Sequence, residues 1–340
     1  MSAAEDVVPT DQEGQAVEAV PKRAMTLGTG TSLLVLGLLI LTPLLVKSFV
    51  TFQMTQLLVY GLAVLALNIL TGGSGQFSLG QSAFYAIGAY ASAILIEQFN
   101  VNYALTIPMA GVLCFAVGFL FGQPALRLSG VYLALATFAL ATAMPQLLKL
   151  NFIEHWTGGV QGLVVDKPDA PFGLPMSQDT WLYYFTLAVT IAIYVASVNL
   201  LRSRSGRAFM AIRDNEIAAS AMGVNVALYK TLAFGVSAGI TGVAGALGAI
   251  VVQFVAPDSF TITLAIQLFL GMVVGGVGWL PGSFVGAAFI IFVPNLAESV
   301  SKGLSGAVFG VLLFLVIYLV PHGARQVAIA GQQLIAKFRR

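Results

Sequence analysis

The chain has 340 residues, of which 58% are hydrophobic and only 9% are charged, and its net charge is +2. Soluble globular domains carry about 25% charged residues, so this composition excludes an ordinary soluble protein. It indicates an all-α integral membrane protein, for which we expect membrane lipids and no nucleic acid as partners. The single cysteine and two histidines form no cluster, so no metal site and no catalytic group is expected.

The first 30 residues are polar and acidic and are predicted to form a disordered cytoplasmic tail, 1–30. Lys22 and Arg23 precede an apolar run that superficially resembles a secretory signal peptide. Because this run continues to about residue 46 without a small-residue cleavage site, we interpret it as a first membrane span. A membrane domain is expected over 31–321, followed by a cytoplasmic tail, 322–340.

A helix needs about 20 mostly apolar residues to cross a bilayer. About ten segments approach that length: 31–47, 53–71, 80–97, 103–122, 130–149, 180–201, 229–254, 261–278, 282–299 and 304–321. If the N-terminus is cytoplasmic, Lys47, Lys149, Lys167 and Lys302 lie outside, and the other 12 of the 16 Lys and Arg residues lie inside. Since positive residues favour the cytoplasmic side, we predict a multi-pass protein of the plasma (inner) membrane with both termini cytoplasmic.

Two glycine-rich stretches interrupt the apolar pattern: "TGGSGQFSLG" at 71–80 and "GGVGWLPGSFVG" at 275–286. One interpretation is a pair of tight cytoplasmic turns with close small-residue packing after each. The other is that the first break shapes a translocation path, because broken helices often mark one in transporters. Phe77, Ser78 and Gln81 would then line it.

An external loop over about 150–179 carries "HWTGGVQGL" at 155–163. Its glycines permit turns, and a tryptophan suits a membrane interface. The motif is either a loop cap with an aromatic anchor or part of an outer mouth that receives substrate. The mouth residues would be Trp156, Thr157, Gly158, Gly159 and Gln161.

A polar stretch, "RDNEIAASAMGVN" at 213–225, lies in the internal loop 202–228. Asp214 or Asn215 is a suitable N-cap, Glu216 suits the first turn of a helix, and Gly223 suits its C-terminal stop. The predicted helix has about two turns and is too short to be stable alone. It either lies on the membrane surface as part of a basic loop or seats in a groove of a soluble partner.

Five motifs in order resemble permeases of the branched-chain amino acid ABC uptake family over about residues 50–320. They are "GQFSLGQSAFYAIGAY", "LRLSGVYLALATFAL", "WTGGVQGL", "RDNEIAASAMGVN" and "GGVGWLPGSFVGA". The chain departs from the family pattern at Gln81, where a histidine is usual, and at Val160–Gln161, where proline–asparagine is usual.

The resemblance implies an ABC importer permease fold with an inverted repeat, in which spans two to five correspond to seven to ten. It also implies a second related permease subunit, two cytoplasmic ABC ATPase subunits and an extracytoplasmic substrate-binding protein. The chain has no phosphate-binding loop, so it is expected to bind no cofactor and not to be an enzyme, with ATP and Mg on the partner subunits. The ATPase-coupling residues would be Arg213, Asp214, Asn215, Glu216, Ile217, Ala218, Ala219 and Gly223.

The same residues also fit other substrates and other mechanisms. Related permeases with these motifs import urea or short amides, and aromatic carboxylates are also conceivable substrates. An ion-coupled secondary carrier is a more distant alternative, and a membrane enzyme is ranked last because no constellation of titratable residues is visible.

Overall fold

The computed structural model describes residues 37, 39–43, 46–125, 130–170 and 176–300, and residues 310, 311, 314, 315, 318, 323 and 324. The tail 1–30, nearly all of 322–340, and most of the predicted spans 31–47 and 304–321 lie outside the described residues.

Every predicted span from 53–71 to 282–299 is helical. The helices are α2 (Ser48–Asn68), α3 (Gln81–Glu97), α4 (Tyr103–Ala125), α5 (Val131–Leu148), α7 (Gln178–Arg202), α10 (Val226–Val252), α11 (Ile262–Gly275) and α12 (Gly282–Val300). Within the described residues, six helical stretches are long and apolar enough to cross a membrane, while α3 and the apolar part of α12 are shorter. The protein is therefore a multi-pass helical membrane protein.

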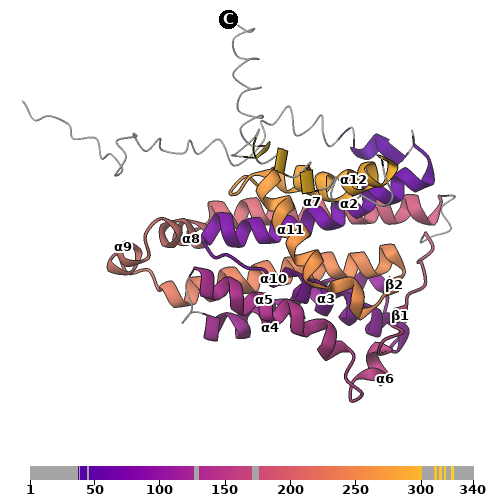
Figure 1. Ribbon diagram of the computed structural model, residues 1–340, viewed down its shortest axis with the longest axis horizontal. Helices are drawn as coiled ribbons and strands as arrows, with labels where there is room; N and C mark the ends of the chain where they lie inside the picture. Colours follow the sequence, from indigo (N-terminus) through magenta and orange to yellow (C-terminus); the bar gives the residue numbers. More distant parts are fainter. Residues whose placement is uncertain are drawn as a thin grey trace, which may run out of the picture.

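Most of these helices run along the long axis of the molecule in two groups (Figure 1). Helices α2, α7 and α12 lie on one side, α3, α4, α5 and α10 lie on the other, and α11 runs between the two groups. Short polar elements gather at the two ends. One end carries α8 (Arg204–Asp214) and α9 (Glu216–Ala221); the opposite end carries α6 (Glu154–Thr157), β1 (Leu163–Val164) and β2 (Phe254–Val255).

The core forms where α10 packs against α4, α3 and α2. Small residues make these contacts close. A Cβ on Gly88 of α3 would lie 2.1 Å from the carbonyl oxygen of Gly242 in α10, and one on Gly286 of α12 would lie 1.8 Å from that of Gly271 in α11. The predicted small-residue packing after each glycine break is thus present, because only a hydrogen fits between these backbones.

The first glycine break begins later than the sequence predicts. Helix α2 does not stop at residue 71 but continues as a π-helix over Ile69–Gly73. The chain then leaves the helix at Ser74, and Gly75 adopts a positive φ of 73°. The wider π-helical turn lets Gly72 and Gly73 stay helical, so the non-helical connection to α3 is confined to about 74–80.

Candidate functional site

Helix α8 attaches the polar end to the membrane domain. The backbone N–H of Gly206 donates to the hydroxyl of Ser203, 3.4 Å away, which caps the helix. Phe209 and Ile212 are fully buried, and the ring of Phe209 meets that of Tyr229 edge-on at 6.2 Å. The Ser203 cap and the spacing of the two apolar residues were the available signals for this helix.

The predicted short helix is present as α9, and its cap is Asn215 rather than Asp214. The side chain of Asn215 accepts a hydrogen bond from the Ala218 backbone N–H at 3.0 Å. At the other end Gly223 has a φ of 82° and donates to the carbonyl of Ser220, while Val224 donates to that of Ala219. These two bonds form a Schellman motif, which satisfies carbonyls that the helix end leaves free.

The faces of α9 differ sharply in exposure. Ile217 is 83% exposed and Met222 85% exposed, and Ala218 and Ala221 are exposed beside them. Ala219 is only 5% exposed and holds α9 against its own chain. Of the apolar residues expected to meet a partner, Ile217 and Ala218 are therefore accessible and Ala219 is not.

The charged residues of this segment contact their own chain. The guanidinium of Arg213 donates from Nη1 to the carbonyl oxygen of Gly72 at 2.8 Å. Its Nε and Nη2 donate to Oδ1 of Asp214 at 3.0 and 2.9 Å. Glu216 pairs with Lys230 at the beginning of α10. The contacts to Gly72 and Lys230 have no local signal in the sequence.

The two glycine breaks meet beside this segment. A Cβ on Gly72 would lie 2.4 Å from the backbone nitrogen of Gly278, so the two backbones touch. The buried side chain of Asn68 accepts from the Gly278 N–H at 2.7 Å. Its amide nitrogen faces three oxygens, the carbonyls of Gly276 (3.3 Å) and Trp279 (3.1 Å) and the hydroxyl of Ser283 (3.2 Å).

The three residues predicted to line a path have different surroundings. Phe77 and Ser78 border a cavity of about 290 Å³ whose other lining residues are Leu79, Gly130, Val131, Ala134 and Phe269. Gln81 does not line this cavity. It is the first residue of α3 and is buried against α10, where its side chain donates to Ser237 at 2.9 Å and accepts from Thr241 at 2.6 Å.

The predicted mouth residues form the loop after α5. Thr157 is buried and donates to the carbonyl of Leu148, the last residue of α5, at 2.9 Å. Trp156 is 42% exposed and stacks on Phe99 with ring centroids 5.8 Å apart. Gly158 and Gly159 have φ values of 69° and 54°, and Gln161 is exposed. The loop then joins the end of α10 through β1 and β2, with Leu163 opposite Val255 and Val164 opposite Phe254.

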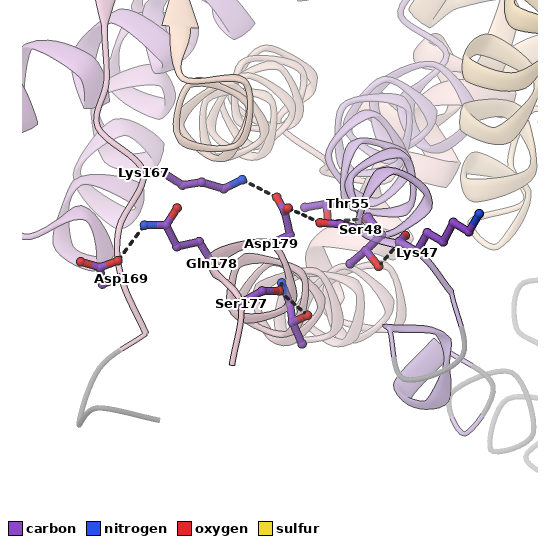
Figure 2. Close-up of polar contacts among 10 residues, drawn as sticks. Lys47, Ser48, Thr55, Lys167, Asp169, Ser177, Gln178 and Asp179 are labelled. Atoms are coloured by element: carbon purple, nitrogen blue, oxygen red, sulfur yellow. Dashed lines mark hydrogen bonds and ion pairs between the residues drawn. The ribbon is translucent and has the colours of Figure 1, made fainter. Parts of the chain in front are cut away.

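Polar contacts at the same end join the long connection before α7 to two helices (Figure 2). Lys167 and Ser48 both donate to the carboxylate of Asp179, near the beginning of α7. Gln178 donates to Asp169 at 2.7 Å. The beginnings of α2 and α7 are thus connected to the stretch before α7. Among the described residues, no group of three His, Cys, Asp or Glu could hold a metal ion.

Comparison with known proteins agrees with a membrane-transport role. The model of the family described as branched-chain amino acid transport system / permease component matches residues 49–320. The high-affinity branched-chain amino acid transport system permease proteins LivM of Salmonella typhimurium and Escherichia coli are each 32% identical to the chain. They align over 292 and 293 residues, 79% of this chain and 68% of each relative.

The autoinducer 2 import system permease protein LsrC of an Enterobacter species is 28% identical over 206 residues, 56% of this chain and of that relative. No solved structure matches the chain.

The bundle of apolar helices with a polar segment at each end defines a multi-pass membrane protein of the permease class. The chain belongs to the family of permease components of branched-chain amino acid transport systems, because the family model covers most of it and the LivM relatives align over most of its length.

Proposed function

We propose that the chain is the transmembrane permease subunit of an ATP-driven importer and that α9 is its coupling helix. The observation that carries the proposal is the exposed apolar face of Ile217, Ala218 and Met222 on a capped helix at a polar end. Apolar side chains gathered on a polar surface are typical of a protein contact. Ala219 and Gly223 shape the helix, and the ATPase subunits receive its exposed face.

The proposed partners are a second related permease, two cytoplasmic ABC ATPase subunits and an extracytoplasmic binding protein. ATP and Mg are bound and used on the ATPase subunits. The binding protein meets the end that carries Trp156 and Gln161. The distribution of charge supports this orientation, because Arg202, Arg204 and Arg207 lie at the α8–α9 end and positive residues favour the cytoplasm.

The complete chain is proposed to have about ten spans and an inverted repeat. Helices α2 to α5 would correspond to α10, α11, α12 and the predicted span 304–321. The packing supports this correspondence, because α2 meets α12 and α11 as α10 meets α4 and α3, and α3 meets α4 as α11 meets α12.

Branched-chain amino acids are the proposed substrates. The cavity bordered by Phe77 and Ser78 supports an aliphatic substrate, since most of its lining is apolar. The alternatives are urea, short amides and aromatic carboxylates. These alternatives stay open because LsrC, which is 28% identical to this chain, is named as the permease of an import system for a different substrate, autoinducer 2.

An ion-coupled carrier is less well supported. Such carriers place working carboxylates inside their spans. In the six described spans the charged residues stand close to the helix ends, as Asp179, Arg202, Lys230 and Asp258 do.

The docking role of α9 is tested by copurification of the ATPase subunits with a tagged, full-length chain. Replacing Ile217 by glutamate removes an apolar contact and is expected to weaken binding by about 2 kcal/mol, roughly thirtyfold. Phe152→Glu is the matched control, since Phe152 is 92% exposed and lies just before α6, which is at the opposite end. The proposal is contradicted if both variants retain the ATPase equally.

A further inference from the structure

Three segments that are distant in sequence meet at Gly72, the fourth residue of the π-helix that ends α2. From one side the guanidinium of Arg213, at the end of α8, donates to the Gly72 carbonyl at 2.8 Å. From the other side, the backbone of Gly278, in the connection between α11 and α12, lies where a Gly72 Cβ would be. Gly72 therefore lies between the segment that precedes α9 and the second glycine break.

The guanidinium is held in a fixed direction. Asp214 accepts from both Nε and Nη2, which orients the planar group and leaves Nη1 to reach Gly72. The last carbonyls of a helix have no partner within it, and a charged donor makes a stronger hydrogen bond than a neutral one. The aliphatic part of the Arg213 side chain also packs closely against the residues that follow the π-helix, because a Cβ on Gly75 would lie 3.1 Å from Cγ of Arg213.

A second contact ties α9 to the same place. Glu216, the first residue of α9, pairs with Lys230 in the first turns of α10. The backbone carbonyl of Lys230 accepts from the side chain of Gln76, which lies in the first glycine break, at 3.1 Å. The short link between α8 and α9 is thus bonded to the region where α2 stops being helical, directly through Arg213 on one side and indirectly through Lys230 on the other.

The region around Gly72, where these segments meet, is called the junction below. On its other side it is bonded to the second glycine break. Asn68 lies one turn before Gly72 and holds the second glycine break through Gly276, Gly278 and Trp279. A displacement of the α2 end must therefore move the connection between α11 and α12 or break these bonds. A π-helical turn is an uncommon conformation, found often at functional sites, and its conversion to α-helix would shift every residue that follows it.

We propose that Arg213 is a positioning residue that transmits movement of α8 and α9 to the π-helical end of α2, and through Asn68 to the second glycine break. The inference rests on the proposed function. It gives Arg213 a role within its own chain, where the sequence suggested contact with the ATPase. Arg213 positions the junction, and the exposed apolar face of α9 binds the ATPase.

The test measures ATP hydrolysis and uptake of labelled leucine in the same proteoliposomes, which contain the complete transporter and its binding protein. Arg213→Ala removes the bond to Gly72, so the ATP hydrolysed per leucine should rise roughly tenfold or more, with the ATPase subunits still bound. Arg213→Lys keeps the charge but lacks the planar fork, and it should give an intermediate ratio.

Arg207→Ala is the matched control. It removes an arginine from the same helix, but the Arg207 side chain is exposed and, within the described part of the chain, bonds only to the carbonyl of Arg202 at 3.3 Å. Its ratio of ATP to leucine should equal that of the wild type. If the Arg213→Ala chain fails to fold, Arg213→Lys and Arg207→Ala carry the comparison.

Two results overturn the inference while leaving the proposed function in place: an unchanged ratio in the Arg213 variants, or loss of the bound ATPase subunits from them. If an Arg213 variant is less stable but hydrolyses the normal amount of ATP per leucine, Arg213 only stabilises the fold, and the inference is overturned in that case too. A wild-type complex that imports no leucine with ATP overturns the proposed function itself, and the role of Arg213 with it.

Discussion

Asn68 should contribute more to the free energy of unfolding than a typical buried polar side chain does. It is fully buried, it accepts one hydrogen bond from the second glycine break, and its two amide N–H groups face three oxygens of that break within 3.3 Å. A typical hydrogen bond contributes about 0.5–1.5 kcal/mol net, and an orphaned buried partner costs about 1–3 kcal/mol. Since Asn68→Ala orphans the Gly278 N–H and weakens the other contacts, we expect a loss of about 3 kcal/mol.

Asn68→Asp separates hydrogen bonding from side-chain volume. A carboxylate still accepts from Gly278 but turns an acceptor toward the oxygens of Gly276, Trp279 and Ser283, so it should destabilise at least as much as alanine. The assay is thermal unfolding of the detergent-solubilised chain, where about 3 kcal/mol corresponds to a fall of roughly 6–12 °C in Tm. Asn199→Ala, at an exposed position of α7, is the control. An unchanged Tm for both Asn68 variants would refute the reasoning.

Three further variants, one of them with a control, probe other contacts. Gly88→Val forces α3 away from α10, because a Cβ would lie 2.1 Å from a backbone oxygen, and should cost about 1–3 kcal/mol in the same unfolding assay. Gly73→Ala is the control: its Cβ would have no neighbour nearer than 3.5 Å, so it should not lower the free energy of unfolding. Gln81→Leu should lower Tm but leave the KM for leucine uptake unchanged, since Gln81 faces α10 rather than the cavity; a raised KM would place it on the path. Thr157→Val frees the last carbonyl of α5 and should reduce capture of the binding protein while α9 still binds the ATPase, as measured by copurification.

Local patterns predict much of this fold. The apolar run 103–122 corresponds to α4 (Tyr103–Ala125), because the thickness of a bilayer fixes the length of a span. The short helix could be predicted from Asn215 and Gly223, since caps act on backbone groups within a few residues.

Contacts between distant segments could not be predicted in this way. The bond from Arg213 to Gly72 joins residues 141 positions apart, and the bond from Gly278 to Asn68 spans 210 positions. Similarly, a glutamine after a glycine break can face either a cavity or a neighbouring helix. The packing of α3 on α10 turns Gln81 toward Ser237, and no local pattern fixes that crossing.

We propose that this chain carries branched-chain amino acids across a membrane at the expense of ATP used by its partners. The most direct measurement is uptake of labelled leucine into proteoliposomes that contain the complete transporter, with the energy source varied. We predict uptake that requires ATP and the binding protein, persists without a proton or sodium gradient, and is not reduced by excess urea. Uptake that follows an ion gradient and ignores ATP would contradict the claim.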